Sequence, residues 1–377
     1  MTERGSGPIA LHYGRFLRID VRHGGTRRSQ QLREILERHG VTVVDVALES
    51  ERRRSRSARA LGVMHGTMVA PVRKLFRARR LAGIYHRAMA DLSLKGAPKD
   101  LPVVWEGGPG ETFYGAWAAV RHGHRVVAVP QNLDSLTPGM ASEWSGRPSP
   151  AWLDEELDEL RHADATFVLS GNDRWLLALH GVEATVLPYH PPADVEEQLL
   201  ELRRLRTGGE TSPGDVLLLG TVGSEPTARG FLDLVRLLES QADLRNAASG
   251  IVVAGYGTER FRPAFERVGA RVLGTVSDAD LRTLQLSARA LLVHYVPAPG
   301  ALTRIPEALI AGMPIIANRH AARGYEAMPG LHVYDGPSEL GQLLAARLPP
   351  PPAPARPVTE TQFAAAVLGG AHRPSKR

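Results

Sequence analysis

The stretch APGALTRIPEALIAGMPII, residues 298–316, indicates an α/β fold. A loop that contains Gly300 precedes an expected short helix from Arg304 to Ala311, and Gly312 and Pro314 end this helix. The apolar run 314–317 that follows predicts a buried strand. Loop, helix and strand in this order are typical of an α/β domain.

The start of this helix carries candidate ligand-binding groups. The backbone amides of Gly300, Ala301 and Leu302 are expected to lie free at the helix N-terminus, where an anion binds readily. Arg304 stands in the first turn and Glu307 one turn later, so both side chains can face one ligand. A cation with free amides suits a diphosphate, and a fixed carboxylate suits a pair of sugar hydroxyls. The alternative is an ordinary helix–strand connection with surface charges.

Several segments upstream follow one another in an order that a known family shares. They are IVVAGYG (251–257), RVLGT (271–275), SDADLRTL (277–284) and ARALLV (288–293). With Gly300, Arg304, Glu307, Gly312 and Pro314, this order resembles the C-terminal half of the large retaining glycosyltransferase family with the GT-B fold, also called group 1 or family-4-like glycosyltransferases. The resemblance extends to VAVPQNLDSL (127–136) and ATFVLS (165–170), and so covers most of the chain.

The resemblance implies two Rossmann-like, doubly wound α/β domains that face each other across a cleft. It implies transfer of a sugar from a nucleotide-diphosphate sugar to an acceptor hydroxyl, with retention of configuration and without a tightly bound metal or cofactor. The acceptor would be a sugar, a lipid-linked molecule or a small natural product. Two alternatives remain open: a non-catalytic GT-B relative that binds a nucleotide or a partner protein, and a GT-B nucleotide-sugar epimerase.

The same resemblance assigns site residues. The donor-binding group is Gly24, Gly25, Ser224, Gly300, Ala301, Leu302 and Glu307. The catalytic group is Gln131, Arg229 and Arg304, and the acceptor-side group is Arg27 and Asn132. No metal ligand is expected, because no His or acidic cluster has the spacing of a metal site.

Three positions depart from the family pattern. Gln131 stands where family members often have a histidine that contacts the donor sugar, and glutamine cannot exchange a proton near neutral pH. Gly223 and Ser224 stand where an arginine of the diphosphate clamp is usual, and Pro299 replaces the first glutamate of the E-x7-E pattern. These departures favour the non-catalytic alternative, or an altered donor specificity.

Length and composition are consistent with two globular domains. The chain has 377 residues, 43% of them hydrophobic, and no cysteine. We expect an N-terminal acceptor-side domain at 1–192, a nucleotide-sugar-binding domain at 193–350, and a Pro-rich linker with a C-terminal helix at 351–377. No apolar run approaches ~18 residues and no signal-peptide pattern is present, which predicts a cytoplasmic location.

Residues 52–90 form a basic segment with 11 Lys and Arg and no acidic residue. Mixed with apolar and aromatic residues, it suits an anionic membrane surface or an anionic acceptor, and it could bind RNA without sequence specificity. A peripheral position at the inner face of the membrane is one consequence. A solvated, Arg-rich insertion is the alternative, and specific nucleic-acid binding is not expected.

Other charged or glycine-rich motifs have simpler interpretations. GGPGET (107–112) lacks the lysine and spacing of a phosphate-binding P-loop. Ser277 with Asp278 and Asp280 predicts a helix cap rather than a metal site. The acids between 154 and 159 are expected to form a solvated helix face. Helices are expected to begin near Thr26, after a Gly24-Gly25 loop, and at Phe231.

Overall fold

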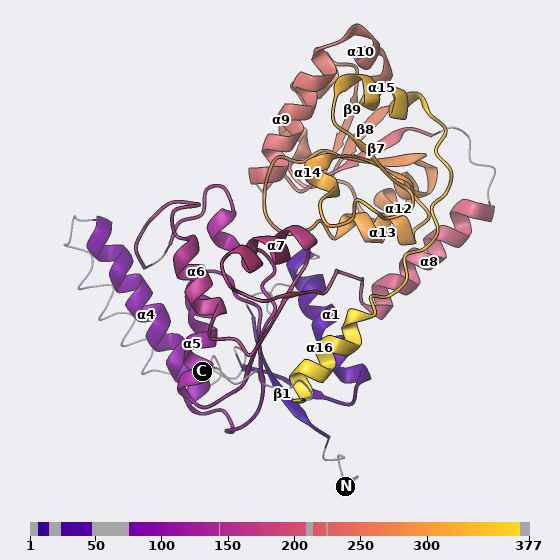
Figure 1. Ribbon diagram of the computed structural model, residues 1–377. Helices are drawn as coiled ribbons and strands as arrows, with labels where there is room; N and C mark the ends of the chain where they lie inside the picture. The colour runs from indigo at the N-terminus through magenta and orange to yellow at the C-terminus, as the bar shows by residue number, and fades with distance from the viewer. Residues whose placement is uncertain are drawn as a thin grey trace. The chain divides into compact units, whose positions relative to one another are not determined.

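The computed structural model describes residues 7–14, 24–46, 75–142, 144–208, 214–223 and 225–369 (Figure 1). The chain divides into two compact units, Met1–Tyr189 together with Pro357–Arg377, and His190–Arg356. Each unit contains one six-stranded sheet, and its named strands pair in parallel. The predicted α/β class with two Rossmann-like units is confirmed.

The sheet of the first unit has the strand order β2-β1-β3-β4-β5-β6. Its strands are β1 (Ile9–Tyr13), β2 (Thr42–Asp45), β3 (Val103–Trp105), β4 (Val126–Ala128), β5 (Ala165–Val168) and β6 (Thr185–Val186). Strands β2 and β3 lie on opposite sides of β1, so the strand order reverses between β1 and β3. Open parallel sheets bind their ligands at such a reversal, beyond the carboxyl ends of the strands.

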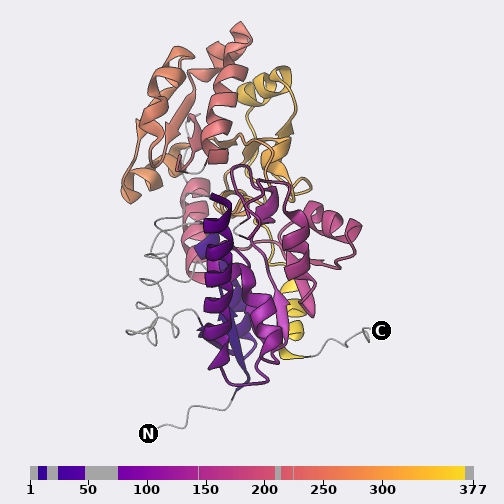
Figure 2. The same cartoon turned by 90° about the vertical axis from the view of Figure 1, so that its left-hand side faces the viewer.

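Side chains of consecutive strand residues point to opposite faces of this sheet, and helices cover both faces. One layer contains α1 (Gly24–Arg38) and α16 (Thr359–Leu368), and the other contains α4 (Leu75–Lys95), α5 (Gly115–Arg121), α6 (Leu153–Leu160) and α7 (Gly171–Leu179). Figure 1 shows α1 beside α16, and in Figure 2, seen from the α4 side, α16 lies behind the sheet. Phe363 of α16 meets Phe167 of β5 edge to face, with ring centroids 5.5 Å apart, so the C-terminal helix belongs to this unit.

The sheet of the second unit has the order β12-β11-β10-β7-β8-β9. Its strands are β7 (Val216–Leu219), β8 (Ile251–Ala254), β9 (Arg271–Gly274), β10 (Ala290–Val293), β11 (Ile315–Asn318) and β12 (Leu331–Tyr334). Read from β9, this is the order of a dinucleotide-binding fold, with its reversal between β7 and β10. The loops that follow these two strands are therefore where a ligand site is expected.

Two hydrophobic layers sandwich this second sheet. One contains α9 (Glu225–Glu239), α10 (Ala242–Ala248), α11 (Arg262–Arg267) and α15 (Pro337–Ala345). The other contains α12 (Asp278–Ser287), α13 (Arg304–Ile310) and α14 (Arg319–Ala322), and α8 (Ala193–Gly208) contacts α12 and α13. Ser277 accepts a hydrogen bond from the Asp280 amide, which confirms the predicted cap of α12.

Two predicted helix starts are wrong. Helix α1 begins at Gly24, so Gly24 and Gly25 lie in its first turn rather than in a loop. Helix α9 begins at Glu225, six residues before the predicted start at Phe231, so Arg229 lies inside the helix. Pro226 in the first turn suits this early start, because proline there gives up no helical hydrogen bond.

Candidate functional site

Glycines bring backbone segments into direct contact at the strand reversal of the second unit. A Cβ on Gly220, just after β7, would lie 2.5 Å from a ring atom of Phe231. Gly255, after β8, has a φ of 125°, and a Cβ there would lie 2.2 Å from the Gly220 carbonyl oxygen. No side chain fits at either place, so the loops after β7 and β8 pack backbone against backbone. Gly223, by contrast, has open space around its Cβ position.

Arg304 lies at this strand reversal and connects the start of α13 to the end of β7. It is the first residue of α13, and its Nη1 donates a hydrogen bond of 2.6 Å to the carbonyl oxygen of Leu219, the last residue of β7. The side chain is half-buried, and burial lowers its pKa, although Tyr295 and Glu307 act in the opposite direction. Within the described ranges, Arg304 forms no ion pair within contact distance, and its Nε and Nη2 donate no hydrogen bond. A half-buried cation with unused donors favours an anionic ligand.

Arg323 fixes the loop before α13 through two hydrogen bonds to its carbonyl oxygens. Its Nε donates to the Gly300 carbonyl oxygen at 2.6 Å, and its Nη2 donates to the Pro299 carbonyl oxygen at 2.7 Å. Because these carbonyl groups are engaged, the loop conformation is fixed while the amides of Gly300, Ala301 and Leu302 stay available. None of these three amides donates a hydrogen bond within the described part of the chain. The sequence analysis did not identify Arg323.

Glu307 lies one turn after Arg304 in α13 and is half-buried, so both side chains lie on the same side of the helix, as predicted.

Arg229 is more exposed than Arg304 and is paired with a carboxylate. It lies on α9, is 57% exposed, and forms an ion pair of 2.5 Å with Glu225 one turn earlier. The predicted diphosphate contact of Arg229 therefore competes with a carboxylate at the start of the same helix. Ser224 lies outside the described residues.

The strand reversal of the first unit holds a buried polar network that the sequence analysis missed. The Glu106 carboxylate, which follows β3, accepts hydrogen bonds from His12 Nε2 at 2.6 Å and Ser29 Oγ at 2.7 Å. It accepts a third from Gln131 Nε2 at 2.5 Å. His12 is 1% exposed and Glu106 is 3% exposed. A Cβ on Gly14, after β1, would lie 2.8 Å from the Glu106 carboxyl carbon, so glycine leaves room for this carboxylate.

The network is extended on the far side of His12 by a second ion pair. Asp45 of β2 lies with one carboxylate oxygen 3.6 Å from His12 Nδ1, and Arg33 of α1 donates to the same carboxylate group. Burial alone would lower the pKa of His12, but Glu106 and Asp45 outweigh it and raise the pKa to about 9. His12 is therefore a buried cation at neutral pH, between two carboxylates.

Gln131 joins this network from the loop after β4. Its Nε2 lies 3.1 Å from the Gly25 carbonyl oxygen and 3.3 Å from Ser29 Oγ, in addition to the bond with Glu106. Gln131 and Gly25, both predicted site residues, are thus brought together. Asn132, the next residue, is exposed.

Glu156 of α6 anchors the same loop. Its carboxylate accepts hydrogen bonds from the amides of Asp134 and Ser135, at 2.8 and 3.0 Å, and from the Ser135 hydroxyl at 2.5 Å. Burial raises the pKa of Glu156 to about 7. Burial also raises the pKa of Glu159 to about 7, and its carboxylate accepts from the Trp117 amide. The predicted solvated face of this helix is therefore wrong for Glu156 and Glu159, because both fold inward to cap backbone amides.

The remaining predicted residues of the first unit lie in α1. Gly24 and Arg27 are half-buried in its first turn. Arg28, the next residue, is fully buried, and its Nη2 donates to the Leu187 carbonyl oxygen at 2.9 Å. Arg28 therefore connects α1 to the end of β6 and has a structural role.

Within the described residues, no group of three or more His, Cys, Asp or Glu side chains could hold a metal ion. No helix among them is long and apolar enough to cross a membrane.

Comparison by sequence matches no family model and no curated protein. Comparison by structure matches solved glycosyltransferases along almost the whole chain. An α,α-trehalose-phosphate synthase (UDP-forming) from Burkholderia xenovorans, solved with glucose-6-phosphate, has a TM-score of 0.56 at 12% identity over 96% of both chains. A trehalose-6-phosphate protein from E. coli, bound with UDP-2-fluoro glucose, has a TM-score of 0.56 at 12% identity over 97% of this chain and 95% of that one. Anabaena HepE, solved with UDP and glucose, has a TM-score of 0.53 at 13% identity over 96% of this chain and 92% of that one.

The chain therefore has the GT-B fold, with two Rossmann-like units. At identities this low, the likeness establishes the fold, and the activity has to be argued from the residues at the two strand reversals.

Proposed function

We propose that this protein is a glycosyltransferase that moves a sugar from a nucleotide-diphosphate sugar to an acceptor hydroxyl. Retention of configuration and independence of a bound metal are part of this proposal. The observation that carries it is the placement of Arg304, a half-buried cation with unused donors at the strand reversal of the second unit. The similar solved structures include proteins with bound UDP or a UDP sugar, which supports a nucleotide-sugar donor.

The donor site is assigned to the second unit. Arg304 and the amides of Gly300, Ala301 and Leu302 would hold the diphosphate, and Glu307 would accept hydrogen bonds from the ribose hydroxyls. Negative charge grows on the diphosphate as the glycosidic bond breaks, so these donors act where the transition state needs them. Arg229 would add a second cation once it separates from Glu225.

Gln131, Gly24, Gly25, Arg27 and Asn132 are assigned to the sugar-binding part of the site in the first unit. Gln131 cannot act as an acid or base near neutral pH. Its proposed role is therefore to contact a hydroxyl, and proton transfer would not pass through it.

A panel of nucleotide sugars tests this function. Release of nucleotide diphosphate is followed with and without a mixture of sugar and lipid-linked acceptors. Acceptor-dependent release supports the glycosyltransferase, whereas release without any acceptor supports an epimerase or hydrolase. Binding of nucleotide diphosphate without release from any donor in the panel would instead support the non-catalytic alternative, which Gln131, Gly223 and Pro299 favour.

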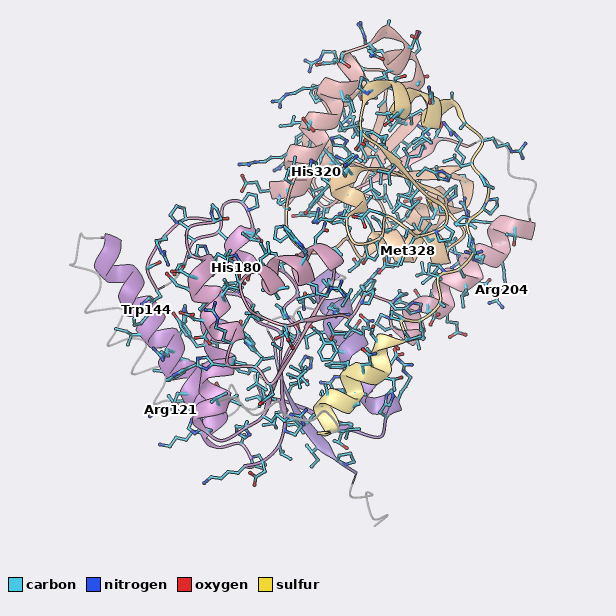
Figure 3. The ribbon with its side chains drawn as sticks, in the orientation of Figure 1. Arg121, Trp144, His180, Arg204, His320 and Met328 are labelled. Carbon is cyan, nitrogen blue, oxygen red and sulfur yellow. The ribbon has the colours of Figure 1, made fainter. Side chains whose placement is uncertain are left out.

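We further propose that the first unit contacts an anionic membrane surface from the cytoplasmic side. The evidence is exposed apolar residues of α4, the helix that contains the last part of the basic segment: Ile84 is 50% exposed and Leu92, two turns later, is 56% exposed. Trp144 packs on α4 at Gly83, and Arg121 pairs with Asp91 of α4 at 3.1 Å, so both flank this helix (Figure 3). Residues 52–74 of the basic segment lie outside the described residues.

Sedimentation with liposomes tests the membrane contact. Binding to anionic liposomes should be strong at low salt and should weaken as the salt concentration rises, because each basic residue near the surface contributes up to about 1 kcal/mol. Replacement of Ile84 and Leu92 by Ser should reduce binding at every salt concentration. Equal binding to neutral and anionic liposomes, or no binding to anionic ones, would rule out this surface.

A further inference from the structure

The orientation of Gln131 is fixed by what its amide nitrogen contacts. A glutamine amide has two N–H donors, and the Glu106 carboxylate at 2.5 Å and the Gly25 carbonyl oxygen at 3.1 Å accept from them. Both acceptors require the nitrogen, so the two ends of the amide group cannot be exchanged. Within the described part of the chain, no hydrogen bond reaches the Oε1 atom of Gln131. Gln131 therefore presents an acceptor and no remaining donor to a ligand.

The charge on Glu106 maintains this orientation. A buried carboxylate is stable as an acceptor where a cation and hydrogen-bond donors surround it. His12 lies 2.6 Å from Glu106 Oε1 on this side, and Ser29 supplies a further donor to Oε2. On the other side of His12, Asp45 lies at 3.6 Å and is itself paired with Arg33. Charges thus alternate from Arg33 through Asp45 and His12 to Glu106.

We propose that His12 and Glu106 are positioning residues that hold Gln131 as an obligate hydrogen-bond acceptor for one hydroxyl group of a sugar. A phosphate or carboxylate group would be excluded from this position, because Gln131 has no donor left and the Glu106 carboxylate lies 2.5 Å behind its nitrogen. This inference rests on the proposed function and specifies the chemistry of its sugar site. Gln131 would contact the sugar, whereas His12 and Glu106 act through it.

Deoxyfluoro sugars test the direction of this hydrogen bond. A C–F group cannot donate, so a fluorine at the hydroxyl that contacts Gln131 should weaken binding about 10-fold, as in the corresponding deoxy sugar. The probes are glucose, galactose and mannose with their monodeoxyfluoro and monodeoxy derivatives, titrated against the full chain in the presence of UDP. In the parent protein, replacement of the hydroxyl at one ring position should show this loss of affinity. Gln131→Met, which keeps the side-chain length without an acceptor oxygen, should bind that analogue and its parent sugar equally.

His12→Gln tests the positioning role. It keeps a donor to Glu106 but removes the positive charge, so discrimination against the fluoro analogue should fall at neutral pH. His124→Gln is the matched control, because His124 is also a buried histidine of the first unit and hydrogen-bonds the Leu101 carbonyl oxygen at 3.0 Å.

Failure of this inference can be told apart from failure of the proposed function. The inference is wrong if no neutral hexose binds, if all fluoro analogues bind alike, or if Gln131→Met keeps the discrimination. It is also wrong if His12→Gln behaves like His124→Gln. The proposed function is tested separately, by release of nucleotide diphosphate from donor sugars, and can fail while neutral sugars still bind at Gln131.

Discussion

The first unit places a buried ion-pair network at its strand reversal, whereas the second unit places glycines, open backbone amides and one half-buried arginine there. In the first unit, His12 and Glu106 satisfy each other and leave only a neutral amide oxygen for a ligand. In the second unit, Arg304 bonds only to the Leu219 carbonyl oxygen among the described residues, so its charge is left for a ligand. Under the proposed function, two sheets with similar architecture would therefore bind different groups, a hydroxyl group in one and an anion in the other.

The largest expected effect concerns Arg304 in the second unit. Arg304→Ala should lower kcat/KM about 100- to 1,000-fold and also lower kcat, because the charge that it stabilises grows as the bond breaks. Binding of a nucleoside without phosphates should change little. Arg304→Gln is the matched variant, since it can still donate to the Leu219 carbonyl oxygen but carries no charge.

Calorimetric titration with nucleoside and nucleotide diphosphate, together with steady-state kinetics, measures both variants. If Arg304→Gln binds the diphosphate as the parent does, the charge has no role and the contrast between the two units disappears.

The two units should respond to pH in opposite directions. In the first unit, the pKa of His12 is raised to about 9, and this contribution to stability is complete below about pH 6.5 and is lost as the pH rises through 9. Burial raises the pKa of Glu156 and of Glu159 from 4.5 to about 7. Their contribution to stability is therefore complete below about pH 4.5 and is lost as the pH rises through 7. In the second unit, burial lowers the pKa of His294 despite its contact with Asp233, so stability is lost as the pH falls below about 6.5.

Protection from hydrogen exchange, corrected for the intrinsic rate at each pH, measures this difference unit by unit. His12 should cost the first unit on the order of 3 kcal/mol of stability between about pH 6.5 and 9, and Glu156 and Glu159 a similar amount each between about pH 4.5 and 7. Glu156→Gln should flatten the slope below pH 7 in the first unit only. Parallel pH profiles in the two units would contradict the assignment.

The residues predicted for the second unit lie together in the structure, whereas the polar network of the first unit was not predicted, and the reason is distance along the chain. Arg304, Glu307 and the amides of Gly300–Leu302 lie within eight residues, so helix geometry alone brings them together. His12 and Glu106 lie 94 residues apart and meet because β1 and β3 are neighbours in the sheet, a pairing that no local pattern states. A polar residue directly after a strand, such as Glu106, was the one available signal.

Strands were predicted more accurately than helix starts. The apolar run 314–317 predicted a buried strand, and β11 (Ile315–Asn318) is buried because both faces of the sheet are covered. The start of α9 was misjudged because Gly230 suggests a loop. In the structure Gly230 is helical, and a Cβ there would lie 2.6 Å from the His294 carbonyl oxygen, so glycine permits close helix–loop packing.

A smaller effect than that of Arg304 is expected at Glu307, and it should have a different profile. Glu307→Ala should weaken binding of nucleoside, nucleotide and nucleotide sugar alike, by roughly 10- to 150-fold, because ribose contacts change little during the reaction. KM for the donor should rise while kcat stays nearly constant. If Glu307→Ala affects only the diphosphate-containing ligands, then Glu307 supports Arg304 and does not bind the ribose.

The smallest expected effect is a gain rather than a loss. Glu225 places a carboxylate in the first turn of α9 and forms an ion pair with Arg229 at 2.5 Å. A carboxylate at a helix N-terminus occupies the position that an anionic ligand would use. Glu225→Gln should therefore free Arg229 and raise the affinity for a nucleotide diphosphate by about 3- to 10-fold, most clearly at low salt.

Glu239→Gln removes a carboxylate from the other end of the same helix, where it pairs with Arg267, and should leave the affinity unchanged. Adding Arg229→Ala to Glu225→Gln should cancel part of the gain, because the freed guanidinium is then missing. If both single glutamine variants bind the diphosphate equally, α9 does not contribute to the anion site, and Arg304 with the amides before α13 would hold the diphosphate alone.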